Sequence, residues 1–291
     1  MDSQPQPQPP THNSYLPHYT PPQVAHHEWR TATNSAAYLI PSLSTLAATT
    51  PSLKLLDIGC GSGTISTSLA SLLPTGSVTA TDISPAILAR AADLAAQAGV
   101  ANISFQEADI YALPFEDATF DVVHASMVLS HLSDPVRAYR EMLRVTKPNG
   151  GLVANRESDL RMWSYYPALP GLRRAHEVLL ATTEAGGGNV DAGARLVAWA
   201  MRAGVGRERI EVSMGTWMYS SVEERRMWGE FGFFYLLWVV WEVARLTICK
   251  ALEWGIATEA DFEEMAEAWA KWQAAEDACH GMMHGEILIR K

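Results

Sequence analysis

The stretch that most constrains the fold is LKLLDIGCGSGT at residues 53–64. Its first half is almost entirely apolar, which is typical of a short strand buried on both faces of a parallel sheet. Its second half places Gly59, Gly61 and Gly63 at alternate positions, and glycine lets the backbone take positive φ and approach a ligand closely. A helical segment begins at Thr64. The order strand, glycine loop, helix predicts an α/β fold with a ligand at the end of this strand.

The spacing of these glycines does not fit a nicotinamide-dinucleotide loop, which needs G-x-G-x-x-G. The last glycine of that motif would fall on Thr64 or Ser66. The motif present here is D-x-G-x-G-x-G, from Asp57 to Gly63. The family resemblance described below implies a ligand that ends in a carboxylate and an ammonium, with Asp57 either supporting the loop or facing the ammonium. The alternative is an ordinary glycine turn of any α/β domain.

A second acid lies at the end of the next predicted strand. Asp82 follows Gly63 by about 20 residues, where a doubly wound sheet places the carboxylate that binds a ribose diol. Capping of the following helix is the alternative role, and we expect Ser84, just before Pro85, to fill it. We therefore predict that Asp82 contacts the ligand, with Ile83 beside it.

Further candidates follow the third and fourth predicted strands or precede the first. Asp109 can accept a hydrogen bond from an exocyclic amine, and Ile110 can cover one face of a base. Ser126 stands at the end of the fourth strand. Arg30 lies in a helical segment that can fold over the ligand, where its guanidinium would pair with a carboxylate. The alternative for Arg30 is a solvent-exposed charge on an amphipathic helix.

Taken together, these stretches resemble the sequential motifs of class I S-adenosylmethionine-dependent methyltransferases, in the branch that serves ubiquinone and menaquinone biosynthesis. The resemblance rests on DIGCGSG, TATDIS, EADIYALPFEDATFDVV and HLSDPVRAYREMLRVTKPNGG, which lie within about 100 residues. The pattern from His27 to Pro41 is similar to a subgroup of the same proteins. One departure is Asn149, since many members have P-G-G at this turn, but asparagine also tolerates positive φ.

The resemblance implies a seven-stranded, mostly parallel sheet in the order 3-2-1-4-5-7-6, with strand seven antiparallel. It also implies S-adenosylmethionine as methyl donor and a small organic acceptor, secondary metabolites included. The residues expected to contact the cofactor are Arg30, Asp57, Gly59, Gly61, Gly63, Asp82, Ile83, Asp109, Ile110 and Ser126.

An oxygen, sulfur or carbon acceptor often needs a base, whereas a free amine does not. His131 follows the fourth strand on the rim where ligands bind, so it is the predicted base or acceptor-orienting group. His124 lies within that strand and is predicted to be structural. Weaker candidates for polar contacts with the acceptor are His176, His280, His284, Glu157, Asp159 and Tyr165.

The chain is predicted to begin with an extended Pro- and Gln-rich tail, residues 1–21, which lacks the apolar segment of a secretory signal. One methyltransferase domain, residues 22–291, follows. Its parts are a helical cover (22–50, interrupted at Pro41), a cofactor-binding half (51–155) and a substrate-side half (156–291).

The substrate-side half is predicted to start with an ordered loop at 156–171. Two long helical stretches, 222–255 and 259–278, form an insertion, or lid, between strands six and seven. Its apolar run at 231–241 is too short to span a membrane. Its many aromatic residues favour an apolar or aromatic acceptor or a partner such as a second copy of the chain. The alternative is that they fill a helix–helix core.

Composition excludes some functions. A net charge of −10 without any run of Lys or Arg argues against binding nucleic acid. The three cysteines lack metal-ligand spacing, so we expect reduced thiols, a cytoplasmic setting and no metal site. Two alternatives to methyl transfer remain open because fold does not fix function. One is a regulatory protein that only binds the cofactor, and the other is an enzyme that uses the sulfonium charge to catalyse a rearrangement.

Overall fold

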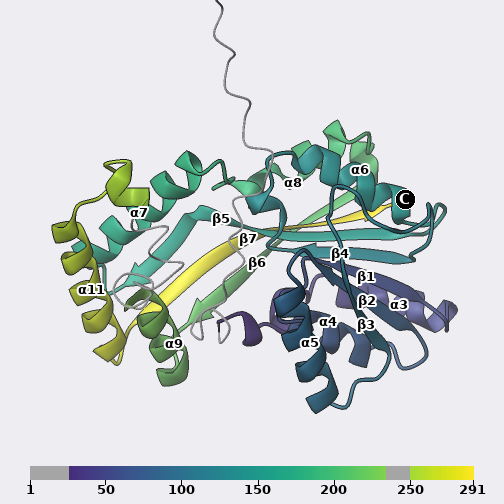
Figure 1. The fold of residues 1–291 in the computed structure, drawn as a ribbon, viewed down its shortest axis with the longest axis horizontal. Helices are drawn as coiled ribbons and strands as arrows, with labels where there is room; N and C mark the ends of the chain where they lie inside the picture. Colours follow the sequence, from purple (N-terminus) through teal and green to yellow (C-terminus); the bar gives the residue numbers. More distant parts are fainter. Residues whose placement is uncertain (1–25, 234–249) are drawn as a thin grey trace, which may run out of the picture.

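The computed structural model describes residues 26–233 and 250–291, which build a seven-stranded sheet with helices on both faces (Figure 1). The strand order is β3-β2-β1-β4-β5-β7-β6, and β7 pairs antiparallel with both of its neighbours. This confirms the predicted topology. The strands are β1 (Lys54–Ile58), β2 (Ser77–Asp82), β3 (Ile103–Glu107), β4 (Val122–Ser126), β5 (Leu152–Tyr166), β6 (Ile210–Tyr219) and β7 (Cys279–Arg290).

The helices alternate with the strands through the first half of the chain and gather around the long strands in the second. They are α2 (Ala32–Ser35), α3 (Ile40–Thr49), α4 (Thr64–Ser71), α5 (Pro85–Gln97), α6 (Pro135–Val145), α7 (Pro170–Ala185), α8 (Ala192–Arg202), α9 (Val222–Phe233) and α11 (Glu259–Ala274). Two short 3₁₀ helices are η1 (Leu129–His131) and η2 (Arg207–Arg209).

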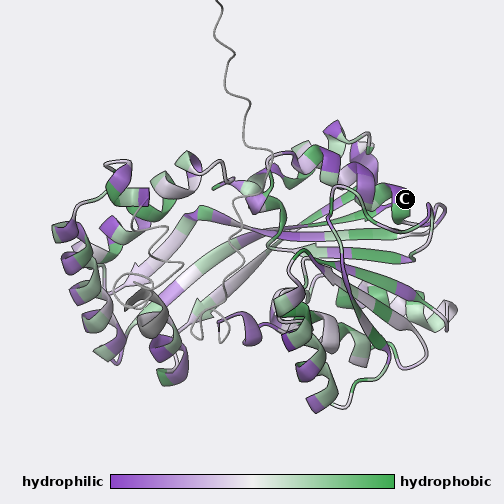
Figure 2. Ribbon diagram, in the orientation of Figure 1, coloured by the Kyte–Doolittle hydropathy of each residue, from purple (hydrophilic) through white to green (hydrophobic). Residues whose placement is uncertain are grey.

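The parallel part of the sheet is buried on both faces, as the apolar strand sequences predict. One face packs under α6 and α8, where Tyr139 and Trp199 are in the same core cluster as Val123 of β4. The other face packs under α3 and α4, through Leu43 and Leu69. Figure 2 shows the hydrophobic residues concentrated on these central strands. The carboxyl ends of β1, β2 and β4 therefore share one edge of a well-packed sheet.

Strands β5, β6 and β7 continue beyond the ends of β1–β4 and form a second region of the sheet with α7, α9 and α11 around it (Figure 1). A third core cluster, rich in aromatic residues, fills this region and includes Leu172 of α7, Trp228 of α9 and Trp269 of α11. We call it the aromatic cluster. The described helices of the predicted insertion, α9 and α11, thus pack on an extension of the sheet.

The prediction of a loop at 156–171 is wrong, because β5 runs on to Tyr166. After a bulge that follows Ser158, it pairs with the first residues of β7. Arg156, where the predicted loop begins, is buried, and its Nε donates to Glu286 of β7. The three aromatic residues that suggested a loop are part of this strand, and the two prolines follow it.

The predicted N-terminal helix is two helices, α2 and α3, joined by a bend. Pro41 lies in the first turn of α3, where its missing N–H and fixed φ are tolerated, so it begins a helix where we predicted an interruption. The tail 1–21, together with 234–249 of the lid and of its apolar run, lies outside the described residues. Among the residues that the structure describes, no helix is both long and apolar enough to cross a membrane.

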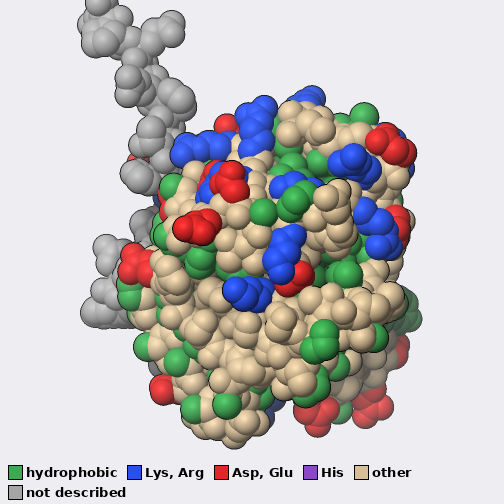
Figure 3. All heavy atoms as spheres, turned by 90° about the vertical axis from the view of Figure 1, so that its right-hand side faces the viewer, with side chains coloured by type: hydrophobic (Ala, Val, Ile, Leu, Met, Phe, Trp, Pro, Cys, Tyr) green, Lys and Arg blue, Asp and Glu red, His purple; other side chains and the backbone are tan. Residues whose placement is uncertain are grey.

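The face that α6 and the C-terminus form carries Lys and Arg side chains interspersed with Asp and Glu (Figure 3). Elements on this side contribute ion pairs between Arg144 and Asp117 and between Lys147 and Asp121. Because both signs of charge alternate, this face differs from the continuous basic surface that a nucleic-acid backbone requires.

Candidate active site

The glycine loop follows β1 with positive φ at each of its three glycines: 66° at Gly59, 54° at Gly61 and 73° at Gly63. A Cβ on Gly59 would lie 2.5 Å from a methyl of Val128, so its absence lets the loop pack against the turn after β4. By contrast, no atom lies within 4 Å of a Cβ built on Gly61. Gly61 therefore borders open space, as a ligand-binding position requires.

Asp57 lies beneath this loop with 3% of its surface exposed. One carboxylate oxygen is 2.7 Å from Nδ1 of His124 on β4, and the other accepts a hydrogen bond from Ser66 of α4. Both oxygens are thus engaged within the protein. Of the two roles left open by the sequence, the geometry fits support of the loop, and His124 has the structural role predicted for it.

Asp82 joins the end of β2 to the glycine loop. Its carboxylate accepts hydrogen bonds from the N–H of Gly61 and from the N–H of Ser84, both at 3.0 Å. Burial is the main cause that raises the pKa of Asp82, and these N–H donors act in the opposite direction. An ionised carboxylate offers about four acceptor positions, so about two remain for a ligand diol.

This geometry corrects one expectation. Ser84 occupies the N-cap position of α5, but its side chain makes no capping bond, and Asp82 binds its N–H instead. Asp82 therefore serves the helix start and the loop together. Ile83 is 48% exposed beside it, an unusual position for a large apolar side chain unless something covers it.

The candidates after β3 and β4 lie in different environments. Asp109 is exposed and accepts a hydrogen bond from Tyr111 N–H at 2.9 Å, while Ile110 is buried in the core under α6. The hydroxyl of Ser126 is buried and has no hydrogen-bond partner among the residues that the structure describes. Buried polar groups are almost always paired, so this hydroxyl fits contact with a bound molecule. Met127, next in the chain, has a φ of 59°, a strained conformation of the kind found at functional sites.

The segment from His26 to α2 packs beside α4, the helix that follows the glycine loop. Thr64 Oγ1 at the start of α4 donates to the carbonyl of His27 at 3.3 Å, and the N–H of Ala32 donates to Ser68 Oγ at 3.1 Å. Glu28 receives a two-pronged hydrogen bond from Arg90 of α5. The segment is therefore fixed to both helices that follow the predicted ligand-binding strands.

Arg30 in this segment reaches the aromatic cluster. Its guanidinium lies 5.0 Å from the centre of the Trp217 ring, and Nη2 is 3.3 Å from Nδ1 of His26. It is also close enough to His131 for its charge to act on that ring, after burial, in lowering the pKa of His131 to about 4. His131 is consequently neutral at physiological pH, with a ring nitrogen able to accept a hydrogen bond or a proton.

Glu157 holds the turn that carries His131, a role that the sequence did not reveal. Its buried carboxylate accepts hydrogen bonds from the N–H groups of Val128, Leu129 and Ser130, at 2.8, 2.8 and 3.2 Å. Burial raises the pKa of Glu157 to about 7. The only sequence signal was an acid just after a strand end, and we had assigned it to the acceptor.

The other weaker candidates belong to the aromatic cluster or to local ion pairs. His280 stacks on Tyr165 at 4.4 Å, and because its Nδ1 donates to the carbonyl of Ser164, its Nε2 carries the lone pair. His176 stacks on Trp163. Asp159 forms an ion pair with Arg161. The cluster is thus lined by aromatic and imidazole rings, with few charges.

A separate cavity of about 610 Å³ lies between the N-terminal segment and β6. None of the predicted cofactor residues lines it. Its wall includes the buried ion pair of Arg156 and Glu286, whose Nε and Oε1 atoms are 3.2 Å apart. Gly215 makes room for this pair, since a Cβ there would lie 2.1 Å from the Glu286 oxygen.

Comparison with known proteins gives consistent matches. A family model described as a methyltransferase domain matches residues 49–184. An uncharacterized methyltransferase of Schizosaccharomyces pombe is 32% identical over 281 residues, covering 91% of this chain and 92% of that protein. A ubiquinone/menaquinone biosynthesis C-methyltransferase of Ectopseudomonas mendocina is 39% identical over 110 residues, covering 37% of this chain and 43% of that protein.

A solved structure shares the fold. Phosphoethanolamine N-methyltransferase 2 of Haemonchus contortus, in complex with S-adenosyl-L-methionine, aligns with a TM-score of 0.51 and 18% identity. The alignment covers 93% of this chain and 57% of that one.

Proposed function

This chain belongs to the class I S-adenosylmethionine-dependent methyltransferases, and on that premise we propose that it methylates a small organic acceptor of apolar or aromatic character. Its cofactor is S-adenosylmethionine. The observation that carries the proposal is the link between Gly61 and Asp82, which joins an open glycine loop to a buried carboxylate with acceptor positions to spare.

The residues at this edge of the sheet fit the parts of the cofactor. Asp82 would accept hydrogen bonds from the ribose diol, with Ile83 against the sugar or base. Asp109 would accept from the exocyclic amine of adenine. The unpartnered hydroxyl of Ser126 and the guanidinium of Arg30 are the groups suited to the amino-acid end.

The cofactor, when bound, supplies a methyl group attached to a good leaving group, a sulfonium sulfur. The protein's part is to hold the acceptor in line with that methyl group and to exclude water. The neutral imidazole of His131 can orient an acceptor hydroxyl or receive its proton. With a pKa of about 4 it is a weak base, so orienting the acceptor is the role that suits it better.

The character of the acceptor is inferred from the aromatic cluster. Trp29, in the segment beside α4, packs edge-on against Trp217 at 5.7 Å and at a tilt against Tyr219 at 5.0 Å. This segment and the aromatic cluster are therefore contiguous. An apolar or aromatic molecule at this boundary would meet the partly exposed ring of Trp29.

Binding and transfer are tested separately. Calorimetry should show that S-adenosylmethionine and S-adenosylhomocysteine bind the full chain, and that Asp82→Ala weakens binding by about 1–3 kcal/mol, the cost of unpaired hydroxyls and a looser loop. Asp93→Ala, an exposed carboxylate on neighbouring α5, is the control and should bind normally. Equal affinity in both variants would refute the ribose assignment.

Transfer is followed with methyl-labelled cofactor and a panel of phenols, quinols, thiols and amines. Label in a phenol or quinol would support the proposal. Binding without transfer to any member of the panel would favour a regulatory protein or an enzyme that uses the sulfonium charge in another way.

A further inference from the structure

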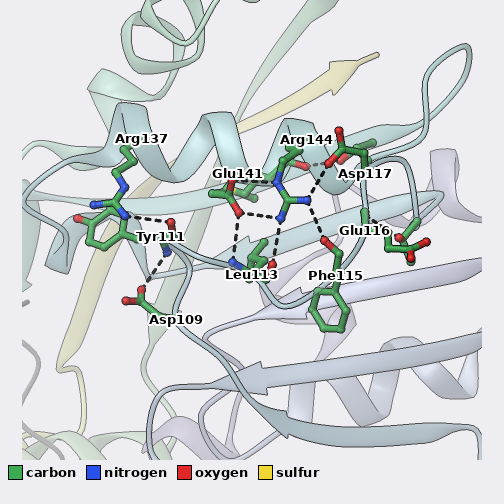
Figure 4. A network of polar contacts seen from close by, with 12 residues as sticks. Asp109, Tyr111, Leu113, Phe115, Glu116, Asp117, Arg137, Glu141 and Arg144 are labelled. Atoms are coloured by element: carbon green, nitrogen blue, oxygen red, sulfur yellow. Dashed lines mark hydrogen bonds and ion pairs between the residues drawn. The ribbon is translucent and has the colours of Figure 1, made fainter.

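Two stretches that carried the family resemblance in the sequence contact each other in space. The loop of residues 109–117, which follows β3, lies along α6 (Figure 4). Asp109 stands at one end of this loop and Asp117 at the other. The contacts between this loop and α6 therefore affect the position of Asp109.

Arg144 on α6 uses all five of its N–H donors on this loop and on one neighbour. Nε and Nη2 form a fork with the carboxylate of Glu141, both at 2.9 Å. The remaining donors reach the carbonyls of Leu113 and Phe115 at 3.0 and 2.8 Å and the carboxylate of Asp117 at 2.9 Å. Single surface ion pairs contribute little, but a bidentate guanidinium in a network fixes geometry as well as charge.

Glu141 completes the attachment. Its carboxylate also accepts a hydrogen bond from the N–H of Leu113 at 3.2 Å. The hydrogen bonds from Arg144 lower the pKa of Glu141, so the pair is ionised at neutral pH. The middle of the loop is thus held through both its N–H and its C=O groups.

The end of the loop near Asp109 is attached through Tyr111. Arg137 lies over the Tyr111 ring at 4.8 Å and donates to its carbonyl at 3.2 Å, and the N–H of Asp134 donates to its phenol oxygen at 2.9 Å. The N–H of Tyr111 in turn donates to Asp109 (Figure 4). A continuous set of hydrogen bonds therefore runs from α6 to the predicted adenine contact.

We propose that Arg144 is a positioning residue for cofactor recognition, which holds residues 113–117 on α6 and thereby sets where Asp109 meets the amine of the adenine ring. This rests on the proposed function, because it takes Asp109 as the adenine contact. It gives Arg144, which is on the outer side of the molecule and touches no predicted ligand position, a role in telling adenine from other bases.

The test compares S-adenosylhomocysteine with S-inosylhomocysteine, in which a carbonyl oxygen replaces the amine and would face the Asp109 carboxylate. Wild-type protein should bind the adenosyl compound at least about tenfold more tightly, the value of one hydrogen bond to a charged group. Arg144→Lys keeps the charge but loses the fork, and it should lower this preference severalfold. Arg140→Lys, on the same helix with a single 3.4 Å contact to a backbone carbonyl, should keep it.

The ratio of the two affinities separates a positioning role from an effect on stability, because a general loosening of the fold weakens the binding of both ligands alike. Glu141→Gln, which breaks the same fork from the other side, should reproduce the loss of preference, and circular dichroism confirms that each variant is folded. A wild-type ratio in Arg144→Lys and Glu141→Gln would overturn the proposal.

Asp109→Ala distinguishes a failure of the positioning role from a failure of the proposed function. It should abolish the preference while leaving measurable binding. If Asp109→Ala binds the cofactor and keeps the preference, the positioning role and the adenine contact of Asp109 are both wrong, whereas the proposed methyl transfer to a small acceptor stands. If wild-type protein binds neither nucleoside, both are wrong.

Discussion

The buried carboxylate of Glu157 should make the protein less stable as the pH rises. The buried histidines should have the opposite effect. Glu157 is fully buried and its pKa is raised from 4.5 to about 7. The perturbation that isolates it is Glu157→Gln, which keeps the shape and one acceptor oxygen but cannot ionise. The quantity to follow is the difference in the free energy of unfolding between wild type and this variant.

The magnitude follows from linkage between protonation and folding. Between pH 4.5 and 7 the folded protein keeps the Glu157 proton and the unfolded chain releases it, so stability falls as pH rises through this window. At 1.36 kcal/mol per pKa unit, the change amounts to about 3 kcal/mol. Above pH 7 both states are ionised and the difference becomes constant. Relative to Glu157→Gln, wild type should therefore lose about 3 kcal/mol between pH 4.5 and 8.

Buried histidines also make the stability of the protein depend on pH, so the effect of Glu157 must be measured as a difference between wild type and Glu157→Gln. The pKa values of His131 and His280 are both lowered to about 4, mainly by burial, so each stabilises the fold above pH 6.5 and loses that contribution as the pH falls toward 4. These contributions are common to wild type and Glu157→Gln and cancel.

Urea unfolding of both proteins at half-unit steps from pH 4.5 to 8 supplies the curves. Glu263→Gln, an exposed position on α11, serves as the control and should give a flat difference. A flat difference for Glu157→Gln would refute the reasoning, because it would mean that the carboxylate is not withdrawn from water beneath η1.

Three other changes test the site and its surroundings. Asp82→Ala should weaken cofactor binding by about 1–3 kcal/mol in calorimetry, with Asp93→Ala unchanged. His131→Asn should lower kcat by at least about tenfold with little effect on the affinity for S-adenosylhomocysteine, and the wild-type rate should show no titration of this imidazole between pH 6 and 8. Gly215→Ala places a Cβ 2.1 Å from the Glu286 oxygen and should lower the free energy of unfolding by about 3 kcal/mol in urea, as expected for a disrupted buried ion pair.

The predictions that succeeded rest on patterns read within a few residues. The buried strand before Gly59 and the position of an acid at the end of β2 could both be predicted from short stretches, because strand burial and loop geometry depend on adjacent side chains. Their arrangement into the order 3-2-1-4-5-7-6 came from the family resemblance and is confirmed. The contacts proposed for Asp82 and Asp109 remain predictions.

The predictions that failed depend on partners far away in the chain. Arg156 looked like the start of a loop because its partner, Glu286, follows 130 residues later. Glu157 looked free to reach an acceptor because nothing in the sequence shows that the turn after β4 presents three N–H groups to it. Periodicity cannot anticipate polar groups that are paired across a sheet, since it treats each as solvent-exposed.

The short N-terminal stretch that begins at His26 bridges two neighbourhoods of the molecule. Its backbone is tied to α4, and its Trp29 ring rests on Trp217 and Tyr219 in the other region of the sheet. Displacing this stretch would break its hydrogen bonds to α4 and its ring contacts with Trp217 and Tyr219 together. A substitution at Trp29 therefore acts on both regions of the sheet at once, so neither region can be remodelled alone.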